Sequence, residues 1–198
     1  MTSIKRRGFL AFGSLAATAF AAPGALRAQN QGALRTIADT LAGDTRFTRF
    51  LDLVTRVSAV EGFRQAAPMT LFAPVDQAFA GAPAGLLQDL LGVGGSGQNQ
   101  GDAERQRVMA LINNHVVAGA FAPEQIAGAD RRIQTLNGGD LQISGQPGNM
   151  TIRNPAPGQQ LGAFGAAGMQ VSAPAQVLGS PVLASNGVIY PISQIIWP

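Results

Sequence analysis

The chain has 198 residues, no cysteine, and 14 basic against 11 acidic residues, a formal net charge of +3. Four of the basic residues and none of the acidic residues lie in the first 28 positions, which leaves ten arginines, no lysine and 11 acids, a net charge of −1. These counts exclude a disulfide framework, a lipoprotein anchor and nitrogen–sulfur metal sites, and they remove the basis for nucleic-acid binding. The roughly 170 remaining residues suit one domain.

The first residues have the layout of an export signal. A basic head ends in Arg6 and Arg7, and an apolar run follows over residues 8–22. This run is shorter than the roughly 20 residues that span a bilayer, so we interpret it as a cleavable signal. Because the paired arginines precede Gly-Phe-Leu, the segment resembles the twin-arginine type, which exports folded proteins from bacteria. We expect residues 1–28 to be the signal and residues 29–198 to form a single domain in the periplasm or outside the cell.

Two short helices are expected at the start of the domain. Apolar residues recur at spacings of three and four over residues 34–41, and Gly43 is placed to end that helix. The same pattern returns over residues 47–57, and the carboxylate of Asp44 is placed to cap this second helix.

A buried strand and further helices are expected next. Residues 69–72 indicate the strand, which should stop before Pro74. Asp76 lies between Pro74 and Phe79, and this position predicts a cap for its own helical turn instead of a catalytic carboxylate. Additional helices are predicted at 86–91 and, capped by Asp102, through 112, on either side of a glycine-rich linker at 92–101.

From residue 116 onward the apolar pattern changes from a helical period to a period of two. Asn137-Gly138 lies between two such stretches and predicts a tight hairpin turn with both residues at positive φ. Pro191 cannot donate a backbone hydrogen bond, so the last strand should be an edge or a bulge there. Helices first and strands later predict an α+β domain with an antiparallel core. Strands are expected at 116–117, 133–136, 141–143, 150–153, 169–172 and 187–197.

No charged residue follows Arg153. Within this stretch, residues 154–168 are rich in glycine, proline and alanine, which indicates a loop, and they include Leu161 and Phe164. An uncharged loop with two large apolar side chains is unusual on a soluble surface. We therefore predict that this loop is a contact surface; the alternative is that both side chains fold back and extend the core.

Residue types that catalysis needs are scarce. His115 is the single histidine of the sequence, and no serine lies in a G-x-S-x-G context. Neighbouring acids such as Asp102 and Glu104 belong to a polar helix start. The G-x-G-x-x-G pattern at 92–97 follows an expected helix instead of a strand, so it indicates a linker and not a phosphate cradle. We predict a non-catalytic protein with no metal and no cofactor.

Four segments, in their order and spacing, resemble the fasciclin-like domain, a family of extracellular adhesion modules. The segments are TLFAPVDQAFA (70–80), INNHVVAG (112–119), QTLNGGDLQIS (134–144) and ASNGVIYPISQIIWP (184–198). The resemblance covers roughly residues 34–198. It implies an α+β fold in which an N-terminal helical layer packs on two small, mainly antiparallel sheets.

The resemblance also implies a binding role for Asn114 and His115. Fasciclin-like domains carry a Tyr-His pair at this position that is implicated in animal cell adhesion, and here asparagine replaces the tyrosine. The residues themselves favour a structural role, in which His115 satisfies backbone groups where a helix passes into a strand. Asn114, His115, Leu161 and Phe164 are the binding candidates.

These observations predict an exported adhesion or binding module at the bacterial cell surface or in the periplasm. Its expected partner is a protein or a component of the cell surface or matrix. Two alternatives stay open: a carrier that holds a small apolar ligand between the helical layer and the sheet, and a self-associating matrix component. Beyond the signal, no window of 18 apolar residues is free of glycine and proline, so no stable membrane anchor is expected.

Overall fold

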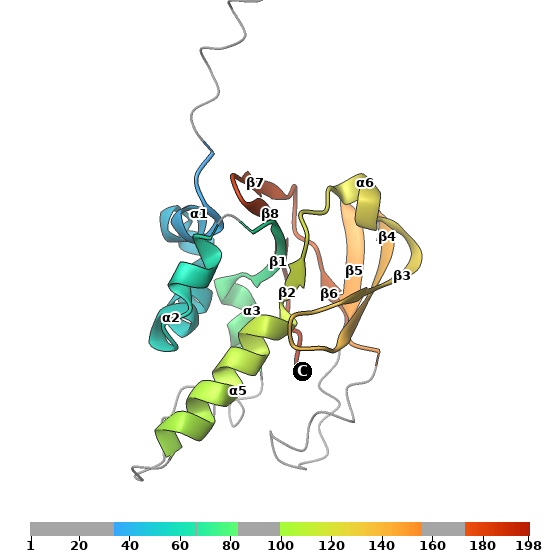
Figure 1. Cartoon of the computed structure of the whole chain (residues 1–198). Helices are drawn as coiled ribbons and strands as arrows, with labels where there is room; N and C mark the ends of the chain where they lie inside the picture. Colours follow the sequence, from blue (N-terminus) through green and yellow to red (C-terminus); the bar gives the residue numbers. More distant parts are fainter. Residues whose placement is uncertain (1–33, 66, 83–99, 156–172) are drawn as a thin grey trace, which may run out of the picture. The chain divides into compact units, whose positions relative to one another are not determined.

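The computed structural model describes residues 34–65, 67–82, 100–155 and 173–198, all within one compact unit formed by residues 33–198 (Figure 1). Several predicted features lie outside the described residues: the signal with Arg6 and Arg7, the helix at 86–91, the strand at 169–172, and the loop residues Leu161 and Phe164. Their roles stay predictions.

The helices of the N-terminal part begin close to the positions that the apolar pattern indicates. The hydroxyl of Thr36 accepts the N–H of Asp39 at 3.2 Å and caps α1 (Ile37–Gly43), which ends at the predicted glycine. Asp44 accepts the N–H of Arg46 at 3.0 Å, and so caps a 3₁₀ turn instead of the next α-helix. The other helical elements are η1 (Thr45–Phe47), α2 (Thr48–Arg56), η2 (Val60–Phe63), α3 (Asp76–Ala80), α5 (Gln100–Asn114) and α6 (Pro123–Ile126).

The cap predicted for α5 is wrong, because this helix begins at Gln100 and Asp102 lies inside its first turn. The inward positions of α5 are as expected, and they are occupied by Val108, Leu111 and Ile112, each buried. None of the described helices is long and apolar enough to cross a membrane.

The strands form two sheets of four (Figure 1). Sheet A has the order β2-β1-β8-β7; its two central strands are parallel and its two outer pairs antiparallel. Sheet B has the order β3-β4-β5-β6 and is antiparallel throughout. The strands of sheet A are β1 (Met69–Pro74), β2 (Val116–Ala118), β7 (Val182–Ala184) and β8 (Gly187–Ile192). Those of sheet B are β3 (Gly128–Gln134), β4 (Asp140–Gln146), β5 (Asn149–Arg153) and β6 (Ala175–Gln176).

Sheet A separates two apolar cores, because successive side chains of a strand point to opposite faces. Leu71 of β1 and Ile189 of β8 join the helices in the first core. Their neighbours Phe72 and Tyr190 join the inner face of sheet B in the second core, where their ring centroids are 5.5 Å apart. The predicted α+β class, with a helical layer on two small and mainly antiparallel sheets, is confirmed.

The hairpin between β3 and β4 forms as predicted, but its turn is of another kind. Gly138 has φ of 85°, whereas Asn137 does not have positive φ. The N–H of Gly138 bonds the carbonyl of Thr135 at 3.0 Å, and the N–H of Thr135 bonds the carbonyl of Gly139 at 2.8 Å. This pattern belongs to a three-residue loop that closes on a glycine in the left-handed region, not to a two-residue turn.

The predicted edge or bulge at Pro191 is also wrong, since β8 is an interior strand of sheet A. Pro191 pairs with Ala73 of β1 on one side. On its other side the ladder with β7 has already ended at Val182, and the Pro191 carbonyl accepts the N–H of Leu178 at 2.8 Å. The side of Pro191 that lacks an N–H therefore faces residues 177–178, beyond the end of the β7 ladder.

Candidate functional site

His115 lies at the junction between α5 and β2, and its imidazole is fully buried. Nδ1 is 2.8 Å from the carbonyl oxygen of Leu111, one helical turn earlier, and Nε2 accepts the backbone N–H of Ile196 at 3.0 Å. A carbonyl can only accept and an amide N–H can only donate, so Nδ1 carries the proton and the ring is neutral. Burial lowers the pKa of His115 from 6.5 to about 4, although the Leu111 carbonyl acts in the opposite direction.

Asn114 binds the other backbone group of Ile196. Its Nδ2 donates to the carbonyl oxygen of Ile196 at 3.0 Å, so two adjacent side chains bind both backbone groups of one residue. Asn114 is fully buried, and its Oδ1 is the buried side-chain atom without a hydrogen-bond partner within the described ranges. The Asn154 amide, just after β5, donates to the carbonyl of Trp197 at 3.0 Å. The C-terminal segment 195–198, itself buried, is thus fastened at two consecutive residues.

Asn114 and His115 therefore stabilise the interior of the domain in this conformation. Neither Asn114 nor His115 has exposed surface, so neither side chain offers a direct contact to a partner. The ring of Phe50, from α2, covers the imidazole on the side of the helices. The two ring centroids are 5.9 Å apart and the ring planes are inclined at 56°. A neutral, fully hydrogen-bonded imidazole of lowered pKa cannot act as a general base without breaking a backbone contact.

Asn186 is a polar anchor that the sequence pattern does not single out. Its Oδ1 accepts the N–H of Ile37 at 2.8 Å, and its Nδ2 donates to the carbonyls of Phe63 and Gln65 at 2.9 and 2.7 Å. It lies in the two-residue turn between β7 and β8, directly before Gly187. The Asn-Gly dipeptide is a turn signal that could have located the turn, but not the three distant partners.

Asp76 has a different role from the predicted one. It opens α3, but no side-chain hydrogen bond caps that helix. Its carboxylate instead accepts the N–H of Arg49, in the first turn of α2, at 2.8 Å. The residue before α2, Phe47, has no capping side chain of its own, so Asp76 caps a helix 27 positions away.

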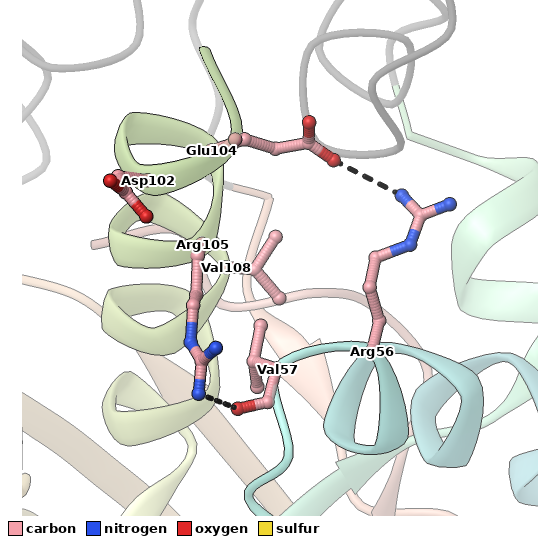
Figure 2. A pocket seen from close by; sticks show the side chains of 7 residues that line it. Arg56, Val57, Asp102, Glu104, Arg105 and Val108 are labelled. Carbon is pink, nitrogen blue, oxygen red and sulfur yellow. Dashed lines mark hydrogen bonds and ion pairs between the residues drawn. The ribbon is translucent and has the colours of Figure 1, made fainter. Parts of the chain in front are cut away.

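Two surface pockets are lined by described residues. The first, of about 370 Å³, lies where α2 meets α5 (Figure 2). Arg56 reaches across it to Glu104 at 3.2 Å, and Arg105 donates to the Val57 carbonyl at 3.0 Å. Arg56 and Glu104 form an ion pair, and the lining also holds one further base, Arg105, and one further acid, Asp102, so its charge favours neither sign of ligand. The second, of about 460 Å³, is lined by Arg46, Val75, Asp76, Gln77, Leu178 and Gly179.

Within the described ranges, no group of three His, Cys, Asp or Glu side chains lies close enough to hold a metal ion. The carrier hypothesis places its ligand between the helices and sheet A, and buried apolar side chains such as Phe50, Leu71 and Ile189 pack together there.

Comparisons with known proteins agree with the fold. A family model described as the fasciclin domain matches residues 45–198. Protein sll1483 of Synechocystis sp. is 26% identical over 163 residues, covering 82% of this chain and 73% of that protein. Immunogenic protein MPB70 of Mycobacterium bovis is 23% identical over 176 residues, covering 89% and 69%. The transforming growth factor-beta-induced protein ig-h3 of Oryctolagus cuniculus is 26% identical over 82% of this chain, which spans 19% of that larger protein.

A solved structure shows the same fold. The FAS1 domain pair from the insect cell adhesion molecule Fasciclin I matches with a TM-score of 0.51 and 13% sequence identity. The match covers 77% of this chain and 45% of that chain. The family model extends over most of the sequence, and the solved structure agrees with it in fold. The chain therefore belongs to the fasciclin domain family.

Proposed function

We propose that this protein is an exported, non-catalytic binding or adhesion module, acting at the bacterial cell surface or in the periplasm after removal of residues 1–28. The observation that carries this proposal is the state of His115, which is buried, neutral and bonded at both ring nitrogens to backbone groups. The residue that could have served as a catalytic base is used to hold the fold together. Family membership and the adhesion role of insect Fasciclin I support the same function.

The loop at 154–168 is the contact surface in this proposal, through Leu161 and Phe164. Both ends of the segment that contains it are attached to sheet B: Asn154 follows β5 and is buried, and β6 begins at Ala175. A rigid sheet that displays an apolar loop is a common arrangement for recognition. Burying the two side chains against a partner would contribute about 3–5 kcal/mol before ordering costs.

Retention on cells tests the function. Labelled protein is added to bacteria from which the gene has been deleted, and we expect saturable retention that unlabelled protein competes away. Leu161→Asp with Phe164→Asp should abolish retention without lowering the melting temperature. Gln159→Asp with Gln160→Asp is the matched control, because it adds the same charges to the same loop and removes no apolar side chain. Equal retention of all three proteins, or unfolding of the first variant, would contradict the contact surface.

A native mass spectrum separates the alternatives. A co-purifying ligand mass would support the carrier, and oligomer peaks would support the self-associating matrix component. A bare monomer that binds cells supports the module proposed above.

Export has its own test. Arg6→Lys with Arg7→Lys should leave uncleaved precursor in the cytoplasm if the twin-arginine route is used. Normal processing of that variant would assign export to the general secretory route instead.

A further inference from the structure

The outer face of sheet B carries a regular array of polar side chains. Leu141 and Ile143 of β4 point into the second core, so the residues that alternate with them point outward. The strand register places Arg132, Gln142 and Arg153 side by side across β3, β4 and β5. The next row across the sheet consists of Ser144, Thr151 and Gln176.

The two arginines of this face are exposed and are not neutralised by acids. Arg153 donates through Nε to the Gln142 side chain at 2.9 Å, which directs it over β4 toward the strand of Arg132. The ion pairs within the described part of the chain include neither arginine. Strands are spaced 4.7–4.9 Å apart, so the two Cα atoms are separated by roughly 10 Å. The acids of the described strands of sheet B are Asp140, at one corner of the paired register, and Asp130, exposed in the bulge of β3.

Arg131 does not belong to this face, although it is adjacent in the chain. It pairs with the inward-pointing Ile143, and its guanidinium donates to the backbone carbonyl of Gln125 in α6. Of the adjacent residues Arg131 and Arg132, Arg132 is therefore the one that can bind a ligand from solvent.

We propose that the outer face of sheet B binds an acidic polysaccharide, with Arg132 and Arg153 contacting successive carboxylates and the amides and hydroxyls between them contacting sugar hydroxyls. This inference rests on the binding-module function and adds to it a second contact surface, besides the loop at 154–168, with its own class of partner. A guanidinium presents a planar fork that matches a carboxylate, and amide side chains both donate and accept. The spacing of the two arginines is on the scale of a disaccharide.

Other macromolecules fit this face less well. A stable protein interface needs a buried apolar or aromatic centre, and every outward residue of the paired register is polar. Single-stranded nucleic acid needs aromatic side chains for base stacking, and a duplex needs many phosphate contacts. A hydrophilic face with two separated positive charges matches an extended, hydroxyl-rich polyanion.

Affinity electrophoresis in gels that contain sodium alginate, neutral dextran or poly-L-glutamate tests the proposal. We expect retardation by alginate alone, weakening as salt rises. Arg132→Gln with Arg153→Gln should weaken alginate binding at least about tenfold, because two charge-assisted contacts are lost. Arg49→Gln with Arg107→Gln removes the same charge from α2 and α5 and should change the affinity less than about twofold. Thermal melting confirms that both variants fold.

Four results would overturn the proposal: no retardation by alginate, equal retardation by dextran, equal weakening in both double variants, or poly-L-glutamate binding as tight as alginate. The last result would point to an acidic protein as the occupant. The cell-retention experiment distinguishes failure of the polysaccharide proposal from failure of the proposed function. Wild-type protein that binds cells but not alginate refutes only the polysaccharide, whereas protein that binds neither refutes the binding module as well.

Discussion

His115 accepts the backbone N–H of Ile196 at 3.0 Å, although 81 positions separate the two residues in the chain. This bond joins the end of α5 to the C-terminal segment, and it exists only while the imidazole is neutral.

Stability should therefore fall on acidification. The pKa of His115 is 6.5 in the unfolded chain and about 4 in the folded protein, so the unfolded state binds the proton more tightly. The stabilisation is complete above pH 6.5 and is lost progressively as the pH falls from 6.5 to 4, by about 3 kcal/mol. Urea titrations at several pH values measure this.

The variant His115→Ala separates the contribution of His115 to the pH dependence of stability from that of the acidic side chains. It should be less stable than wild type at pH 7 by about 2–4 kcal/mol, and the difference should shrink toward pH 4. Wild-type and variant curves that stay parallel over this range would show that His115 does not control the acid dependence.

Removal of the long-range cap at Asp76 should destabilise α2. Asp76→Ala leaves the N–H of Arg49 without its acceptor and should cost about 1 kcal/mol, whereas Asp76→Asn keeps an acceptor and should cost less. The exposed neighbour Gln77 provides the control, Gln77→Ala. Unfolding in urea measures all three, and a loss in Gln77→Ala as large as in Asp76→Ala would contradict the capping role.

The observed turn at Gly138 predicts unequal effects of two substitutions. A side chain at Gly138 would meet no atom within 4 Å, but φ of 85° strains any residue other than glycine. Gly138→Val should therefore cost about 1–3 kcal/mol from backbone strain alone. Asn137→Gly relieves no strain, because Asn137 does not have positive φ, and should be nearly neutral. Stabilisation by Asn137→Gly would indicate the two-residue turn after all.

Gly187 is required for the close approach of β8 to β1. A Cβ at this position would lie 1.9 Å from the carbonyl oxygen of Met69, a backbone atom that cannot move aside. Gly187→Ala should cost several kcal/mol, on the order of 3 or more, or prevent folding. Gly62→Ala, where nothing lies within 4 Å, is the control. Comparable melting temperatures of the two variants would mean that β1 and β8 can separate at low cost.

The sequence alone was sufficient to predict many of the helices and strands and the fold class, but not η2, α6, β6 or β7. The apolar spacing in α1, α2 and α5 matches most of the residues that are buried, because periodicity records which face of a helix meets the core. Leu34, the first residue of the predicted pattern, precedes α1 and is 58% exposed. The two-residue period after residue 116 likewise predicted strands in β2, β4 and β5. Family resemblance supplied the layer arrangement. Gly43 was correctly placed as a helix end, and Asp44 is a cap as predicted, although of the 3₁₀ turn before α2, because these signals act over a few residues.

Only the tertiary structure decided which distant groups the polar side chains meet. Asp76 has the position of a local cap, yet packing of α3 against α2 presents the N–H of Arg49 to it instead. Pro191 is tolerated inside a sheet because β7 ends before reaching it. The proline by itself does not predict where the neighbouring strand ends. The outward row of Arg132, Gln142 and Arg153 likewise depends on the register of three strands. Short-range patterns determine which way a residue points within its own element, but a hydrogen-bond partner far along the chain is chosen by how the elements pack.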